Sequence, residues 1–310
     1  MTKFKKSLAF TSGAIALLGI GLATRNNLLA KKSKEDFPKL GKFCNVQGCS
    51  IHYFTEGSGS PVVFIHGEQG DIYDFYLSPI WSKLKNSFQI TAIDRPGYGY
   101  STRAEWKDYG FRNQGEILHQ TIKLLNLKKP VLVGFGEACG IIIAMLLEHQ
   151  DNYSGAILID EKLPAKRELN DKIVNAPLVG KLLLWTVSPV IAQKQANDKL
   201  KETDLPRENL KKATSFDVLP NSILSSSQDK EFMKIEELKT LADIYDKVHV
   251  PVTFIKRKDT QDEEIELINQ LNLEDIIDKL YISTAKDINS EHIPLTNSEK
   301  IISVIDKILK

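Results

Sequence analysis

Cysteine is scarce in this sequence, and neither sign of charge is in clear excess. Three cysteines in 310 residues are too few for a disulfide scaffold and do not resemble a zinc-binding set. The 41 basic and 40 acidic residues give a formal net charge of +1. That balance gives no reason to expect a nucleic acid or a strongly acidic partner. We therefore expect no nucleic-acid partner, no cofactor and no metal.

One long apolar run is present, and it lies at the amino terminus. Lys3, Lys5 and Lys6 precede an apolar stretch from Leu8 to Ala23, and further basic residues follow. The stretch is near the lower limit of roughly 17 residues for crossing a bilayer, and no small-residue cleavage site follows it. We expect residues 1–36 to be an uncleaved single-span anchor and linker, in a bacterial inner membrane. The alternatives are a cleaved signal peptide, giving a secreted or periplasmic protein, and a buried core helix.

Short β-branched runs alternate with helical patterns between residues 61 and 160. This alternation predicts an α/β fold with a doubly wound, mostly parallel sheet and helices on both faces. A hairpin turning at Gln47-Gly48 precedes it. The expected strands are 61–65, 88–93, 131–133, 155–160, 250–255 and 279–283, and the expected helices lie near 73–84, 117–125, 141–147, 263–271 and 297–309.

The β signal disappears between residues 161 and 248, where the chain is rich in lysine. Apolar residues recur through this segment, which favours an inserted helical cap over a disordered linker. The expected organisation is an anchor segment and linker at 1–36, a first core part at 37–160, the cap at 161–248, and a second core part at 249–310.

The stretch from Val131 to Gly140 has the frame of a nucleophile elbow. A buried strand leads into a bend that contains Gly134, Gly136 and Ala138, and an apolar helix follows. In the G-x-S-x-G elbow, small flanking residues let the chain turn sharply under a central nucleophile. Gly136 occupies the central position, where it suits a strained backbone but carries no nucleophilic atom. The alternative is an ordinary strand–turn–helix with a glycine turn.

These features resemble the α/β-hydrolase family. The resemblance rests on His66-Gly67, on the stretch Asp94-Arg-Pro-Gly-Tyr-Gly-Tyr-Ser101, on the elbow frame at 134–138, on Asp259, and on His292-Ile-Pro294. It covers the chain from about residue 37 and is greatest for the branch with an N-terminal membrane anchor and a helical cap. It implies an α/β-hydrolase fold and an esterase-like or lipase-like protein that takes a small hydrophobic or ester-like ligand.

The resemblance also implies the members of the site. Carried over by position, His292 is the general base and Asp259 the acid that orients it, while Gly136 marks the vacant nucleophile position. The oxyanion donors are the backbone amides of Glu68 and Glu137. Loss of a triad nucleophile lowers the rate by about a millionfold. We therefore expect a weak or inactive hydrolase that acts by binding a ligand or a partner.

The alternative is an active hydrolase of ester-type bonds that uses the same histidine and aspartate. Glu68 or Glu137 would hold the attacking water, or Cys139 would replace the serine, although either glutamate would place negative charge beside the oxyanion hole. Asp160, at the end of a predicted strand, is the alternative acid. Epoxide hydrolases and dehalogenases need an aspartate at the elbow centre, so the glycine there argues against them equally.

Overall fold

A computed structural model describes residues 3–68, 70–104, 108–164, 166, 168–176, 179–200, 215–216, 218–257, 270–285 and 298–309. The chain divides into two compact units. Unit 1 combines Met1–Lys39 with Glu168–Ser227, and unit 2 combines Leu40–Arg167 with Gln228–Lys310. The segment expected to form the cap is thus divided between the units, and the expected domain boundaries stay a prediction.

In the described part of the chain, unit 2 is built on an 8-stranded sheet with the order β1-β2-β4-β3-β5-β6-β7-β8. Strands β1, β2 and β4 pair antiparallel, and every pairing from β4 through β3 to β8 is parallel. This confirms the predicted α/β fold with its mostly parallel sheet. The strands are β1 (Lys42–Val46), β2 (Cys49–Glu56), β3 (Pro61–Ile65), β4 (Gln89–Ile93), β5 (Val131–Phe135), β6 (Gly155–Ile159), β7 (Val252–Arg257) and β8 (Leu280–Ala285).

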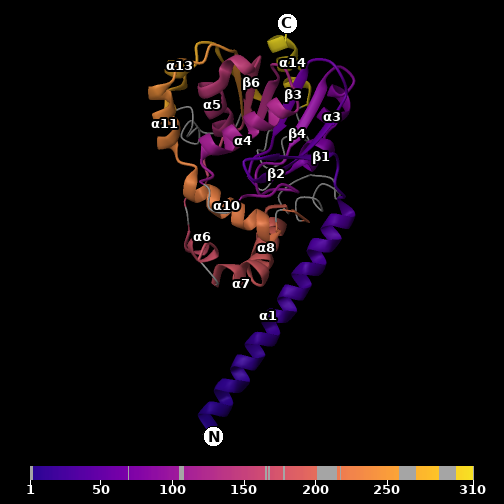
Figure 1. Cartoon of the computed structure of the whole chain (residues 1–310), viewed down its shortest axis with the longest axis vertical. Helices are drawn as coiled ribbons and strands as arrows, with labels where there is room; N and C mark the ends of the chain where they lie inside the picture. Colours follow the sequence, from indigo (N-terminus) through magenta and orange to yellow (C-terminus); the bar gives the residue numbers. More distant parts are fainter. Residues whose placement is uncertain are drawn as a thin grey trace. The chain divides into compact units, whose positions relative to one another are not determined.

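Helices of unit 2 cover both faces of this sheet (Figure 1). Val63 and Ile65 of β3 join one hydrophobic cluster, while Val62 and Phe64 join the other, because successive strand residues point to opposite faces. Burial on both faces explains why the strand is apolar throughout. The helices are α4 (Phe111–Leu124), α5 (Ala138–His149) and α11 (Ile235–Ile244) on the first face, and α2 (Ile72–Tyr76), α3 (Pro79–Leu84) and α14 (Ser298–Leu309) on the second; a short α13 (Leu273–Ile276) precedes β8.

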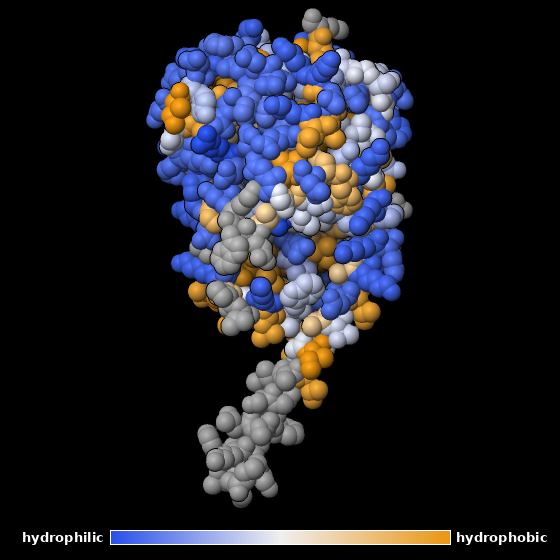
Figure 2. Space-filling view, viewed as in Figure 1, coloured by the Kyte–Doolittle hydropathy of each residue, from blue (hydrophilic) through white to orange (hydrophobic). Residues whose placement is uncertain are grey.

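The surface view agrees with this burial. The face of the molecule in Figure 2 is mostly hydrophilic over the sheet and its covering helices, since the apolar strand residues lie inside. The strands β5 and β6 are buried at every residue, and their carboxyl ends meet that of β3 at one edge of the sheet. Loops at such an edge are where ligands bind in α/β sheets.

One of the expected helices differs from the structure. The single helix expected near 73–84 is two helices, α2 and α3, because Ser78 caps α3 and Pro79 is its first residue. Ser78 Oγ accepts a hydrogen bond from the Ile80 N–H at 3.2 Å. Proline is favourable at the first position of a helix but lacks the N–H that would continue the preceding one. The helix expected near 263–271 falls largely outside the described residues.

Unit 1 is helical where it is described. The side chain of Asn26 donates hydrogen bonds to the carbonyls of Trp185 and Thr186 at 3.1 and 2.8 Å. Ser33 Oγ donates to the Ser215 carbonyl at 3.1 Å. The second half of the first helix is therefore part of a packed helical unit. Its helices are α1 (Lys3–Asp36), α6 (Leu169–Val174), α7 (Val179–Trp185), α8 (Ser188–Leu200) and the first part of α10 (Pro220–Phe232).

The expected membrane anchor is wrong. Among the helices of the described residues, none combines the length and the apolar character that crossing a bilayer requires. Helix α1 is long, but its second half carries Arg25, Lys31, Lys32 and Lys34 and bonds to other helices of unit 1. The membrane localisation and the membrane partner that were inferred from the anchor are corrected with it.

Candidate active site

The elbow between β5 and α5 has the backbone of a nucleophile elbow. Gly136 has φ of +55°, in the left-handed region that glycine adopts without strain. Its N–H donates to the Ile159 carbonyl at 3.0 Å, and the Cys139 N–H donates to the Gly136 carbonyl at 3.2 Å. Among the described residues, a Cβ at position 136 would meet nothing closer than the Cα of Gly67, at 3.9 Å. The elbow therefore has room for the side chain that it lacks.

The loop after β3 runs close beside this elbow. A Cβ on Gly67 would lie 2.9 Å from the Phe135 carbonyl oxygen, so only glycine allows the approach. The next residue along this loop is Glu68, which is exposed. Its charge acts on the carboxyl of Glu137, the residue after the elbow centre. The two residues expected to supply oxyanion donors therefore lie on neighbouring loops.

Glu137 is a buried carboxyl, with 3% of its surface exposed. Burial raises its pKa well above the usual value, and the charge of Glu68 raises it further against the opposing effect of Arg95. Its Oε2 lies 3.6 Å from Arg95 Nη1 and has no hydrogen-bond partner in the described chain. Burial thus favours the neutral acid. The negative charge that the sequence suggested beside the oxyanion hole is reduced accordingly.

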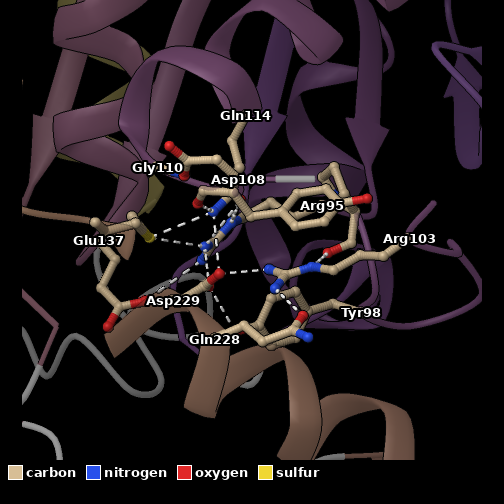
Figure 3. Close-up of polar contacts among 12 residues, drawn as sticks. Arg95, Tyr98, Arg103, Asp108, Gly110, Gln114, Glu137, Gln228 and Asp229 are labelled. Carbon is tan, nitrogen blue, oxygen red and sulfur yellow. Dashed lines mark hydrogen bonds and ion pairs between the residues drawn. The ribbon is translucent and has the colours of Figure 1, made fainter. Parts of the chain in front are cut away.

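A buried ion cluster lies next to Glu137 (Figure 3). Asp229, on α10, accepts hydrogen bonds from Arg95 Nη2 at 2.6 Å, from the Tyr98 hydroxyl at 2.7 Å and from Gln114 Nε2 at 3.0 Å. It also pairs with Arg103. Burial alone would lower the pKa of Arg95, but Asp229 and other neighbouring groups outweigh it and raise that pKa. The cluster joins the loop after β4, helix α4 and helix α10.

Arg95 connects this cluster to the elbow. Its Nη1 donates to the Gly67 carbonyl at 3.1 Å and faces Glu137. Its backbone N–H donates to His66 Nε2 at 2.8 Å. A fully buried guanidinium requires partners of this kind, because an unpaired buried charge is strongly destabilising. Arg95 therefore fixes the position of the loop after β3, which carries Gly67, relative to the elbow.

Two acids follow β6, beside the elbow. Asp160 is buried and has φ of +45°. Glu161 is 7% exposed, and its Oε1 has no hydrogen-bond partner among the described residues. Burial raises the pKa of Glu161 to about 7. Its charge is the strongest one acting on Cys139, which shows that the carboxyl lies near the start of α5. A carboxyl of this pKa is suited to general acid–base catalysis.

Cys139 does not have the surroundings of a nucleophile. It is fully buried, and its Sγ lies 3.6 Å from the Gly134 carbonyl oxygen and 3.7 Å from that of Ile159. Burial, followed by the charge of Glu161, raises the pKa of its thiol well above the usual value. Reactive cysteines have the opposite environment, in which positive charge stabilises the thiolate.

The predicted base and acid of the triad, His292 and Asp259, lie outside the described residues. Their roles stay predictions. The structure places Gly136, Glu68 and Glu137 at one edge of the sheet, together with Asp160.

Comparison with known proteins decides the family. Residues 60–214, half of the chain, match the model of the α/β hydrolase fold family. The chain belongs to the α/β-hydrolase family. Support for the branch with a membrane anchor is lacking, because the anchor itself is not found in the described helices.

This hydrolase-fold protein is related to enzymes with several activities. A cis-3-alkyl-4-alkyloxetan-2-one decarboxylase of Shewanella oneidensis is 30% identical over 102 residues, which are 32% of this chain and 31% of that protein. Haloalkane dehalogenase 2 of Mycobacterium tuberculosis is 27% identical over 108 residues, covering 35% and 37%. These alignments span about a third of the curated relatives' length. The Cif epoxide hydrolase of Acinetobacter nosocomialis shares the fold, with a TM-score of 0.70, 15% identity, and coverage of 93% and 97%.

Three residues of this hydrolase-fold site escaped the sequence analysis. Arg95 belongs to a motif that identified the family, but the motif does not show that the side chain turns inward. Asp229 lies 134 residues from Arg95 and has no local signal. Glu161 follows Asp160, and its place directly after a predicted strand was the signal that could have identified it.

Proposed function

We propose that this protein binds a small hydrophobic or ester-like ligand at the elbow without forming a covalent intermediate. It is then a weak or inactive hydrolase. The observation that carries the proposal is Gly136, which keeps the φ of a nucleophile elbow while supplying no nucleophile. Loss of the nucleophile removes the covalent route and lowers the rate of hydrolysis by about a millionfold.

The surroundings of the elbow support ligand binding. The loop at Gly67 keeps its close approach to the elbow, and Arg95 holds that loop through buried hydrogen bonds. Helix α5 starts directly after the elbow, and the backbone amides at a helix start attract partial negative charge such as a carbonyl oxygen. The names of the curated relatives describe enzymes of small organic molecules.

The test restores the missing hydroxyl. We expect Gly136→Ser to hydrolyse p-nitrophenyl esters of short and medium acyl chains faster than the wild type, and to react with a fluorophosphonate probe. Gly136→Ala is the matched control, because it has the same Cβ and the same backbone strain but no hydroxyl. The wild type and the alanine variant should remain unlabelled. Labelling of the wild type, or equal ester hydrolysis by wild type and serine variant, would contradict the proposal.

A second candidate is hydrolysis of ester-type bonds by an activated water. Glu161 favours it, because a buried carboxyl with an unpartnered oxygen and a pKa of about 7 can accept a proton from water. In this case the wild type would hydrolyse esters but would not react with the fluorophosphonate probe. Glu161→Gln would abolish that turnover if the glutamate is the base, and His292→Ala would abolish it if the predicted histidine is.

A further inference from the structure

Far from the elbow, helices α4 and α5 bring two carboxylates and an imidazole together. Glu116 of α4 and the adjacent pair Glu148 and His149 at the end of α5 each offer one ligand atom, and these atoms lie within 4.8 Å of one another. The two helices pack side by side on the sheet (Figure 1). The elbow lies at the other end of α5, about 18 Å away at 1.5 Å per residue. The cluster is therefore separate from the elbow.

One oxygen of Glu116 is anchored while the other faces the imidazole. Its Oε1 accepts a hydrogen bond from Gln120 Nε2 at 2.6 Å, and its Oε2 lies 2.8 Å from His149 Nε2. In metal sites, outer hydrogen bonds of this kind hold a carboxylate in its ligating orientation. The orientation here is thus set by a residue one helical turn away.

Glu148 shows the same division between its two oxygens. Its Oε1 accepts hydrogen bonds from Arg112 Nε and from the Tyr245 hydroxyl, both at 2.8 Å. The described residues supply no hydrogen bond to its Oε2, although the side chain is only 8% exposed. An oxygen that accepts no hydrogen bond is available to a ligand, while Arg112 and Tyr245 hold the carboxylate through its other oxygen.

The ring of His149 is held in its plane by a second histidine. His119 stacks on it with centroids 3.8 Å apart and planes 13° apart. The Nδ1 of His119 lies 2.7 Å from the Tyr153 hydroxyl. The stack therefore orients the ring of His149.

We propose that Glu116, Glu148 and His149 form a binding site for a divalent first-row metal ion. Two carboxylate oxygens and one imidazole nitrogen match Zn²⁺ with water as the fourth ligand. The ion would take the place of the proton between His149 and Glu116, and it would complete the coordination of Glu148. Mg²⁺ and Ca²⁺ prefer all-oxygen sites and should bind more weakly.

The site would fasten α4 to the end of α5. A ligand that binds the folded chain and not the unfolded chain raises the thermal midpoint, to an extent set by its concentration relative to Kd. The ion would therefore act on stability at a place remote from the elbow. This role does not depend on the proposed function of the elbow.

The test is Zn²⁺ binding to the full chain, without an affinity tag and after removal of metals with a chelator. Calorimetry should give one Zn²⁺ per chain, and Zn²⁺ should raise the Tm. Removal of an outer hydrogen bond typically lowers the affinity for a metal by about 10–100-fold. His149→Ala and Glu116→Gln change proposed ligands themselves, so we expect at least that loss of Zn²⁺ affinity from either variant. Asp151→Asn, an exposed acid two residues after His149, is the matched control and should bind like the wild type.

Binding that is equal in wild type, His149→Ala and Glu116→Gln would overturn the proposal, as would the absence of Zn²⁺ binding. Equally tight binding of Mg²⁺ would also overturn it. Glu116→Gln keeps the shape of the side chain, so it remains informative if the alanine variant fails to fold. Circular dichroism of each variant without metal establishes which variants are folded.

Discussion

The guanidinium of Arg95 and the carboxylate of Asp229 form a buried ion pair, with 2.6 Å between Nη2 and Oδ2. Neither side chain exposes more than 1% of its surface. Arg95 reaches from this pair to the elbow at Glu137, and Asp229 belongs to α10. The position of the elbow therefore depends on a contact between distant parts of the chain.

Removing Asp229 should destabilise unit 2 strongly. Asp229→Asn leaves two buried arginines without their carboxylate, and breaking a buried pair typically lowers the free energy of unfolding by about 3–5 kcal/mol. Urea unfolding followed by circular dichroism measures the loss. Asp243→Asn, at an exposed acid of α11, is the control and should change stability by less than about 0.5 kcal/mol. Similar values for the two variants would refute the structural role of the pair.

Glu161 should make stability fall as pH rises. Burial raises its pKa to about 7 from a usual value of 4.5, so between these values the folded chain keeps a proton that the unfolded chain has lost. The stabilising effect is complete below pH 4.5 and is lost as pH rises to about 7, with a slope of at most about 1.4 kcal/mol per pH unit. Glu161→Gln removes this contribution to the pH dependence of stability. Urea unfolding at several pH values should show that the free energy of unfolding of the variant increases relative to that of the wild type up to about pH 7. Parallel profiles of the two proteins would contradict the assignment.

Gly136 should tolerate a side chain at a moderate cost in stability. A residue other than glycine at φ of +55° is strained by about 1–2 kcal/mol. The described part of the chain adds no clash to this, because its nearest atom to the new Cβ would be 3.9 Å away. Gly136→Ala and Gly136→Ser should therefore lose similar amounts in denaturant unfolding. A loss above about 4 kcal/mol for either variant would mean that the elbow has no space for a nucleophile.

Asn26 should stabilise unit 1. Its amide donates to the two carbonyls of Trp185 and Thr186, at the end of α7, and it is 4% exposed. Asn26→Ala leaves these carbonyls without that donor, at a cost of about 1–3 kcal/mol. Hydrogen exchange should become faster in α7 and α8 but not in the strands of unit 2. Thr24→Ala, at an exposed position on the same helix, is the control, and an equal change there would count against the role of Asn26.

Local patterns predicted the fold well. The β-branched runs of β3, β5 and β6 are apolar throughout because both of their faces are buried, and the small residues at 134, 136 and 138 fit only a sharp turn. The break between α2 and α3 was missed because the apolar periodicity continues across Ser78 and Pro79. The anchor was wrong because the basic residues after the apolar run were taken as the flank of a membrane span. In the structure they lie on the second half of the same helix, which bonds to other helices of unit 1.

Contacts between distant residues could not be predicted from the sequence. Asp229 is one polar residue among several on α10, and only the fold brings it to Arg95. The cluster of Glu116 and His149 joins residues 33 positions apart. Cysteine spacing, on which the expectation of no metal rested, carries no information about it. Neither the Arg95–Asp229 pair nor the Glu116–His149 cluster follows a repeating pattern in the sequence, so periodicity does not reveal these contacts.

The order in which the chain is made gives the Arg95–Asp229 pair a further consequence. During synthesis, the amino-terminal part of unit 2 emerges from the ribosome long before residue 229 is added, because Arg95 and Asp229 are 134 positions apart. Until then the arginine has no carboxylate from α10 and favours exposure to water. The loop after β4 should consequently be among the last parts of the nascent protein to close. A chain that ends before α10 should be recognised by chaperones as unfinished.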